Sequence, residues 1–217
     1  MRKFTERQLP EGVSFDEHFQ PSYNPWDQRL CVVPNSDLFR ALRAGTVSVV
    51  TDTIDTFTPT GIRLSSGREL EADIIVTATG LKLLAFGGIE LSLDGVKAEA
   101  SKSMSYKGLM LSGIPNFAYT IGYTNASWTL KADLVGEYVN RLLSYMDAHG
   151  LSAVVPVRDD SVAERPFMDL ASGYIQRALD DLPKQGDRAP WMLAQNYLSD
   201  IRTIRKDRID DDVLAFS

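Results

Sequence analysis

The chain has 217 residues, of which 44% are hydrophobic and 24% charged, and its formal net charge is -6. This composition predicts a soluble globular protein of one or two domains that can bury a core. The acidic balance argues against nucleic-acid and anionic-membrane partners, because both require clustered Lys and Arg.

The first predicted elements lie in the N-terminal third of the chain. Residues 16–34 are aromatic and proline-rich, which indicates an extended loop. A short helix is expected from Asp37 to Ala44, with Asn35 or Ser36 as its cap and Gly45 as its stop. β-Branched and alternating residues then predict short strands. These cover residues 47–51, 55–58, 61–64 and 69–71.

Residues 72–80 have a different pattern. Ile74, Ile75 and Val76 follow one another without alternation, which is typical of a strand covered on both faces of a sheet. The residues up to Gly80 are small, so a ligand or another backbone can approach closely there. Residues 113–122 predict a turn that leads into another buried strand.

The clearest predicted helix begins near Thr129, after a turn rich in Thr, Asn and Ser, and ends at Gly150. Its hydrophobic residues recur every three or four positions: Leu130, Leu134, Val135, Tyr138, Val139, Leu142, Leu143 and Met146. This stripe makes the helix part of the core. Only its first turn is free for a ligand, where N–H groups can face an anionic or carbonyl oxygen. Most strand–turn–helix units bind nothing, so the alternative of a purely structural turn stays open.

The last region begins at Leu151 and contains a further predicted helix from about Trp191 to Arg205. No catalytic constellation is visible in it. A packing or subunit-contact role is the favoured interpretation, and an active-site lid is the alternative.

Cysteine, histidine and hydrophobic runs limit the remaining classes. The single cysteine, Cys31, excludes an intramolecular disulfide and suits a reducing, cytoplasmic compartment. His18 and His149 have no neighbours at ligand spacing, so no metal site is expected. No stretch reaches the roughly 18 apolar residues of a transmembrane helix, and the first residues lack the apolar run of a signal peptide.

Residues 72–80, residues 113–123 and the helix opening at Thr129 resemble the carboxy-terminal half of flavin-containing and Baeyer–Villiger monooxygenases. The similarity covers nearly the whole chain. It implies a partial Rossmann-like flavoprotein with a small β-strand excursion and a helical C-terminal region. The implied domains are the carboxy-terminal part of an NADPH-binding domain (1–80), the carboxy-terminal part of an FAD-binding domain (81–150) and a helical extension (151–217).

The resemblance also implies the cofactors FAD and NADPH and a reaction with O₂. Through a C4a-peroxyflavin, such enzymes insert one oxygen atom into a ketone or oxidise the sulfur of a sulfide or thioamide. Flavin contacts are expected from Thr129, Leu130 and Asn125, and Gly80 marks the return from the NADPH domain to the FAD domain. The helix start near Thr129 then points toward the pyrimidine carbonyls of the flavin.

Arg29 is the expected catalytic residue, because its place before the short helix matches an arginine that lies over the flavin in Baeyer–Villiger enzymes. A permanently charged guanidinium can stabilise an anionic peroxyflavin and polarise a substrate carbonyl. Trp26, Tyr123 and Trp128 are expected to line the substrate pocket. Relatives often have lysine just before the arginine, whereas Gln28 stands here, so the way in which the NADPH 2′-phosphate is recognised is left open.

The family needs two Gly-x-Gly-x-x-Gly fingerprints, and none is present in this sequence. The chain is therefore expected to be about half of an enzyme and to bind FAD weakly or not at all by itself. The alternative function is a non-catalytic remnant or interaction module that binds no FAD. The natural substrate and the oligomeric state, including a homo-oligomer, are left open.

Overall fold

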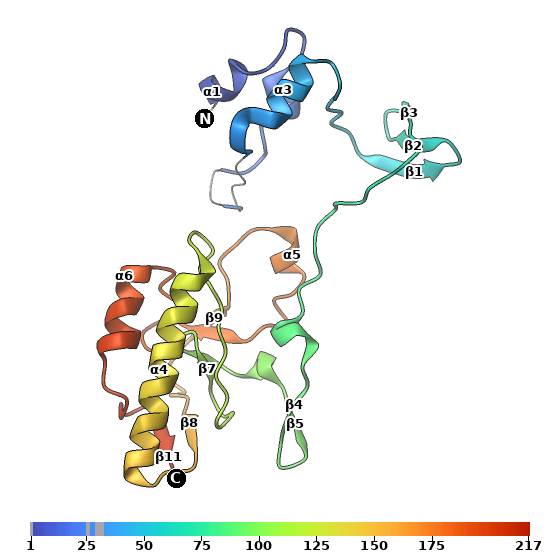
Figure 1. Ribbon diagram of the computed structural model, residues 1–217. Helices are drawn as coiled ribbons and strands as arrows, with labels where there is room; N and C mark the ends of the chain where they lie inside the picture. The colour runs from blue at the N-terminus through green and yellow to red at the C-terminus, as the bar shows by residue number, and fades with distance from the viewer. Residues whose placement is uncertain (1, 25–26, 29–32) are drawn as a thin grey trace. The chain divides into compact units, whose positions relative to one another are not determined.

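The computed structural model describes residues 2–24, 27–28 and 33–217. The chain divides into two compact units, Met1–Gly80 and Leu81–Ser217. Helices and small sheets occur in both units, so the coarse α/β class is confirmed (Figure 1). The sheets among the described residues are antiparallel and have two or three strands. The Rossmann-like organisation stays a prediction.

The first unit consists of short helices followed by one three-stranded sheet. Its elements are α1 (Arg2–Glu6), α2 (Phe15–His18), η1 (Pro34–Ser36), α3 (Asp37–Arg43), β1 (Ile54–Thr58), β2 (Gly61–Leu64) and β3 (Glu69–Glu71). The sheet order is β1-β2-β3, and it forms as its alternating sequence predicts. Helix α3 confirms the predicted short helix, with Gly45 following at a φ of 70°.

Two predicted strands of this unit do not form. Residues 47–51 make no ladder in the structure. The prediction of a buried strand in residues 72–80 is also wrong, because these residues pair with no strand and are exposed. Ile74 and Val76 are 81% and 82% exposed. A hydrophobic run becomes a central strand only when neighbouring strands and covering helices are present, and the described residues supply none for it.

The second unit is built around one long helix, α4 (Trp128–His149). Its other helical segments are η2 (Ala85–Gly88), η3 (Ala100–Lys102), α5 (Gly173–Gln176), α6 (Tyr197–Asp200) and η4 (Ile201–Lys206). Its strands pair as β4 (Leu91–Leu93) with β5 (Val96–Ala98), β6 (Ser105–Tyr106) with β7 (Met110–Leu111), β8 (Val154–Pro156) with β11 (Leu214–Phe216), and β9 (Glu164–Pro166) with β10 (Lys184–Gly186).

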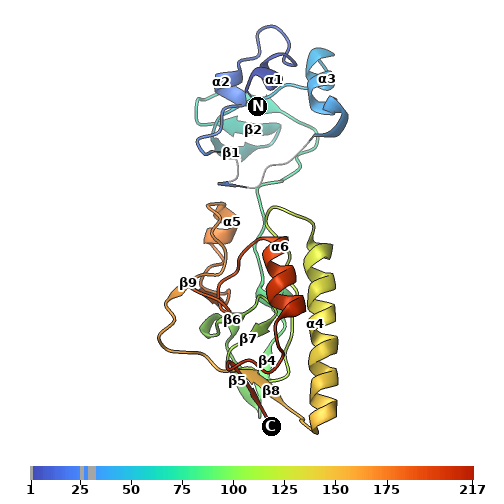
Figure 2. The same cartoon turned by 90° about the vertical axis from the view of Figure 1, so that its left-hand side faces the viewer.

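Helix α4 confirms the predicted helix almost residue for residue. Leu134, Tyr138, Leu142 and Met146 are buried in the main core, and Gly150 ends the helix in the left-handed conformation. Figures 1 and 2 show α6 and η4 running beside α4. The apolar stripe therefore packs against both the small strands and the C-terminal helical segment, which explains why so many of its residues are buried.

Three sequence-based expectations for this unit need correction. Residues 113–122 make only an isolated bridge, Met110 with Ala118, and bury alternate side chains instead of both faces. The helix expected from about Trp191 begins only at Tyr197, where Asn196 caps it through the Ser199 N–H. The segment after Gly150 also contains four of the short strands, so it is not purely helical.

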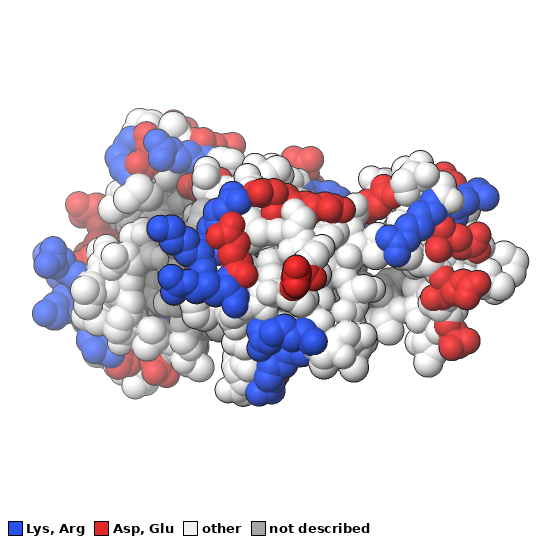
Figure 3. All heavy atoms as spheres, turned by 90° about the horizontal axis from the view of Figure 1, so that it is seen from above, with Lys and Arg blue, Asp and Glu red and all other residues white. Residues whose placement is uncertain are grey.

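On the face drawn in Figure 3, Lys and Arg side chains lie among Asp and Glu side chains. Within the described part of the chain, no helix is both long enough and apolar enough to cross a membrane.

Candidate cofactor site

The polar turn before α4 is shaped by a close contact between a glycine and a tryptophan. A Cβ atom on Gly122 would lie 2.0 Å from Cγ of Trp128, so any larger residue would displace the indole. Trp128 itself remains 52% exposed. The indole therefore packs across the backbone of the incoming chain and leaves its outer face on the surface beside the start of the helix.

The first turn of α4 has no side-chain cap. Ser127 occupies the N-cap position, but no backbone N–H bonds to its hydroxyl. The hydroxyl instead lies 2.7 Å from Oγ1 of Thr129. The N–H groups at a helix start need acceptors from outside the helix, and their partial positive charge favours electron-rich oxygens.

These residues fit one end of a flavin. The uncapped amides near Thr129 and Leu130 suit the pyrimidine carbonyl oxygens of an isoalloxazine ring. They do not provide a cradle for the pyrophosphate, because the chain has no Gly-x-Gly-x-x-Gly. Among the described residues, no group of three or more His, Cys, Asp or Glu side chains could bind a metal ion.

A buried polar cluster lies behind this turn, and we call Tyr123, Lys131 and Asp200 the Asp200 cluster. The Tyr123 hydroxyl donates to Oδ2 of Asp200 at 2.7 Å. The Lys131 ammonium donates to the same oxygen at 2.8 Å and to the backbone carbonyl of Lys107 at 3.2 Å. All three side chains are buried. A buried lysine and a buried carboxylate tolerate desolvation only when they are paired in this way.

The Asp200 cluster has a distinct electrostatic state. Burial lowers the pKa of Lys131, and the hydrogen bond and charge of Asp200 oppose that shift. Burial raises the pKa of Tyr123, and the neighbouring Asp200 carboxylate raises it further. The tyrosine is therefore a neutral donor, and the ammonium depends on Asp200 for its remaining charge stabilisation.

A small cavity of about 100 Å³ borders the Asp200 cluster. Its lining includes Tyr123, Lys131 and Gln195. Gln195 accepts hydrogen bonds through Oε1 from the Thr124 N–H at 3.0 Å and from the Thr124 hydroxyl at 3.3 Å. The segment that leads into α6 therefore contacts the polar turn at its first residue.

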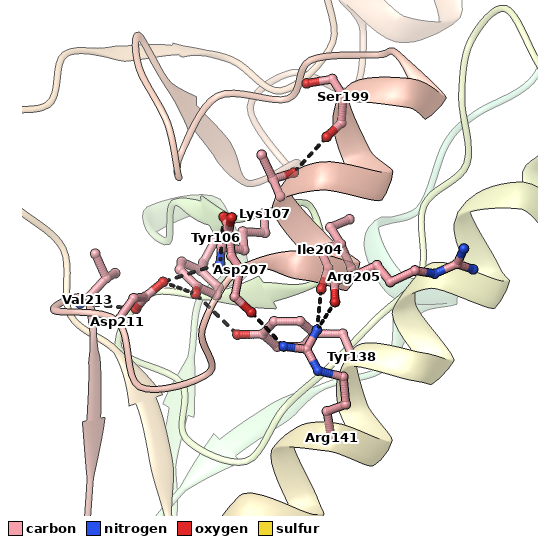
Figure 4. A network of polar contacts seen from close by, with 11 residues as sticks. Tyr106, Lys107, Tyr138, Arg141, Ser199, Ile204, Arg205, Asp207, Asp211 and Val213 are labelled. Carbon is pink, nitrogen blue, oxygen red and sulfur yellow. Dashed lines mark hydrogen bonds and ion pairs between the residues drawn. The ribbon is translucent and has the colours of Figure 1, made fainter.

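A second polar cluster, here called the Asp211 cluster, contains Tyr106, Lys107, Tyr138 and Asp211 (Figure 4). The Tyr106 hydroxyl donates to Oδ2 of Asp211, and Lys107 Nζ lies 3.3 Å from the same oxygen. Tyr138 then donates to Tyr106 across 3.2 Å, because the Tyr106 proton is already used. Nearby, Arg141 donates to the last carbonyls of η4, including that of Ile204 at 2.9 Å.

The structure brings several of the expected site residues onto one turn. Asn125 is exposed within it, Thr129 is exposed at the helix start, and Leu130 is half-buried. Tyr123 enters the turn but directs its hydroxyl to Asp200. Trp128 lies across Gly122.

The remaining expected site residues are elsewhere. Gly80 ends the first unit at a φ of 111°. Arg29 and Trp26 lie outside the described residues, so their roles stay predictions.

Sequence reasoning missed Lys131, Asp200 and Gln195. For Lys131 a signal existed, since it is three residues before Leu134 and four before Val135, on the apolar face of α4. A lysine at such a position indicates a buried partner. Asp200 and Gln195 are 69 and 64 residues from Lys131 in the chain, and local patterns do not report contacts over that separation.

Comparison with known proteins found close relatives. The chain is 64% identical to the FAD-containing monooxygenase EthA of Mycobacterium tuberculosis over 213 residues, which cover 98% of this chain and 44% of that protein. It is 57% identical to EthA of Mycolicibacterium smegmatis over 98% of its length and 43% of the relative.

A further relative carries a different name. The probable FAD-binding monooxygenase AlmA of Acinetobacter baylyi is 51% identical over 99% of this chain and 43% of that protein. No family model matches the chain, and no solved structure matches it. The chain thus spans less than half the length of the curated relatives that it matches.

Proposed function

We propose that this chain, which is related to the FAD-containing monooxygenases over nearly all of its length, forms part of an FAD- and NADPH-dependent monooxygenase. The proposed reaction inserts one oxygen atom of O₂ into a ketone or transfers it to the sulfur of a sulfide or thioamide. The observation that carries the proposal is the joint occurrence of 64% identity and an uncapped helix start on an exposed polar turn.

Bound FAD would supply the two-electron chemistry with O₂. The chain's own part is to bind and orient it. The N–H groups of Thr129 and Leu130 would bind the pyrimidine carbonyls, where negative charge collects on reduction. Asn125 adds an exposed amide to the same turn, and Trp128 adds an apolar surface beside it.

Arg29 is the proposed catalytic residue on chemical grounds. A guanidinium stays protonated at all relevant pH values and can polarise a ketone carbonyl through paired N–H donors. Trp26 and Trp128 are the proposed apolar side chains of the substrate pocket, and NADPH is the proposed reductant. Gln28 cannot provide the positive charge that a 2′-phosphate favours, so a different cation must serve that role.

The test uses purified protein. A yellow protein that oxidises NADPH and converts a ketone to an ester, or a sulfide to a sulfoxide, supports the proposal. In that protein, Arg29→Ala should lower ketone oxygenation by at least about 100-fold while flavin reduction continues. Unchanged ester formation by Arg29→Ala would remove this residue from the mechanism.

A second candidate function is a non-catalytic module that needs another polypeptide. The exposed run of Ile74, Ile75 and Val76 favours it, because contiguous apolar side chains on a surface commonly mark an interaction site. A colourless, self-associating protein that gains no flavin absorbance on addition of FAD would support this candidate and contradict catalysis by the chain alone.

A further inference from the structure

The turn that the proposed function assigns to the flavin is tied at both ends to one oxygen atom. Tyr123 directly precedes the turn, and Lys131 follows it inside the first turns of α4. Both donate to Oδ2 of Asp200, at 2.7 and 2.8 Å. The two flanks of residues 124–130 therefore meet at a single carboxylate.

A second contact from the same segment reaches the interior of the turn. Gln195 accepts from the N–H and the hydroxyl of Thr124. Its φ of 48° is in the left-handed region, which a residue other than glycine adopts at a cost of about 1 kcal/mol or more. Such a conformation persists only where surrounding contacts enforce it. The chain thus places both Gln195 and Asp200 against the turn from the segment leading through α6.

Stability alone gives no reason for an ion pair at this place. Lys131 occupies a position on the apolar face of α4 between core residues, where a leucine or methionine would pack. A buried ion pair is rarely more stabilising than apolar side chains of similar volume. What a buried ion pair adds is geometric specificity, because charged hydrogen bonds fix the relative orientation of the groups that make them.

We propose that Asp200 is a positioning residue for the cofactor turn: by joining Tyr123 to Lys131, it fixes the direction of the N–H groups at the start of α4. Asp200 does not touch the flavin. It acts through the two residues that flank the turn, and the inference about flavin affinity rests on the proposed function. The C-terminal segment is then part of the cofactor site, although it presents no residue to the cofactor.

The Asp211 cluster provides a matched control. Asp211 also accepts from a tyrosine hydroxyl and pairs with a lysine, Tyr106 and Lys107, and it lies in the same C-terminal region. Its partners are consecutive residues, at the end of β6 and at the start of the turn between β6 and β7. Asp211→Asn therefore removes a similar set of contacts without releasing the flanks of the cofactor turn.

The first experiment is hydrogen–deuterium exchange on the full chain without FAD. In Asp200→Asn, those amides of residues 122–131 that have acceptors, such as the Thr124 N–H bonded to Gln195, should exchange about tenfold faster or more, because a hydrogen bond to a charged group contributes roughly that factor. Asp211→Asn should leave these amides unchanged and accelerate those of residues 105–111. Equal acceleration of residues 122–131 in both variants would overturn the proposal.

A milder variant guards against global unfolding. Tyr123→Phe keeps the ring in the core and deletes only one of the two contacts to Asp200. Its turn amides should also exchange faster, by a smaller factor than in Asp200→Asn. If the turn amides of Tyr123→Phe exchange at the wild-type rate, the hydrogen bond from Tyr123 to Asp200 does not hold the turn in place.

The second experiment measures FAD affinity by quenching of flavin fluorescence. Asp200→Asn should raise the dissociation constant about tenfold, and Asp211→Asn by less than about twofold. When Lys131 is already replaced by methionine, adding Asp200→Asn should raise the dissociation constant for FAD less than it does in wild type. The reason is that the contact between Lys131 and Asp200 is already missing. Additive effects would overturn the proposal. If wild type binds no FAD, the proposed function fails for this chain, and hydrogen exchange still decides the positioning role.

Discussion

The two units of this chain contain similar local elements but bury them to different degrees. In the first unit, the described hydrophobic side chains that are buried are Leu42 and Leu64. In the second unit, α4, the small strands and η4 surround a continuous core that includes Leu134 and Ile204. The comparison teaches that local patterns suffice to form helices and hairpins, whereas burial depends on partners that come from elsewhere in the sequence.

The two units differ in how far their own segments cover their apolar residues. The chain spans 44% of the length of EthA of Mycobacterium tuberculosis, which it matches over nearly its whole length. In the first unit, the described residues leave Ile74 and Val76 exposed to solvent. The second unit needs less from outside, since α4 is already covered by segments of the same unit.

The largest expected effect tests the difference between the two cores. Leu134→Ala should lower the free energy of unfolding by about 2 to 5 kcal/mol, because the side chain is fully buried and its removal leaves a cavity. Leu64→Ala in the first unit should cost less, since fewer apolar groups surround it. Urea denaturation followed by circular dichroism measures both changes.

Leu143→Ala is the matched control for that experiment. Leu143 lies on the same helix but is 54% exposed, so its replacement should change the free energy of unfolding by less than about 0.5 kcal/mol. A loss for Leu64→Ala as large as that for Leu134→Ala would show that the first unit has a core of equal quality, and the comparison would fail.

An intermediate effect concerns pH. Burial raises the pKa of four tyrosines in the second unit, and that of Tyr138 reaches about 12. The others are Tyr106, Tyr119 and Tyr123. An unfolded tyrosine has a pKa of about 10, so above that pH the unfolded chain binds fewer protons than the folded chain. Stability should be complete below about pH 10 and decline as the pH rises toward 12.

The size and the control of this pH effect are well defined. Each buried tyrosine can remove up to about 1.4 kcal/mol per pH unit in that window. Urea denaturation at increasing pH, with tyrosinate absorbance as the second probe, measures the decline. Tyr138→Phe should make the free energy of unfolding decline less steeply with pH, because one of the four buried tyrosines no longer contributes. A free energy of unfolding that stays constant from pH 10 to 12 would mean that these hydroxyl groups are not buried as described.

Much of this fold could be predicted from local sequence, and the reason is visible in α4. Its periodic apolar residues and its Gly150 stop act within a few residues, so the helix follows from the sequence alone. The same holds for β1 to β3. The prediction of strands at residues 72–80 and 113–122 was wrong, because a strand forms only when neighbouring strands pair with it. The described chain does not supply such neighbours.

The candidate site was predictable to a lesser extent. The polar turn and the free helix start were recognised from their residue types, and they lie together as expected. The Asp200 cluster was not recognised, because it joins residues that are separated by 69 and 77 positions. Lys131 in the apolar stripe was the one local signal of it. The roles of Arg29 and Trp26 stay predictions, since both residues lie outside the described part.

The smallest effect on stability, and the sharpest test of the comparison, concerns the exposed run of the first unit. Replacing Ile74 and Val76 together by serine should change the free energy of unfolding by less than about 0.5 kcal/mol, because both side chains already face solvent. Self-association measured by light scattering should nevertheless decrease, since exposed apolar side chains promote association between molecules. Replacing Thr56 and Arg63 by serine in the paired strands β1 and β2 serves as the control and should not reduce self-association. If instead the double serine variant of Ile74 and Val76 loses more than about 1 kcal/mol, the run is covered in solution, and the two units differ less than their burial indicates.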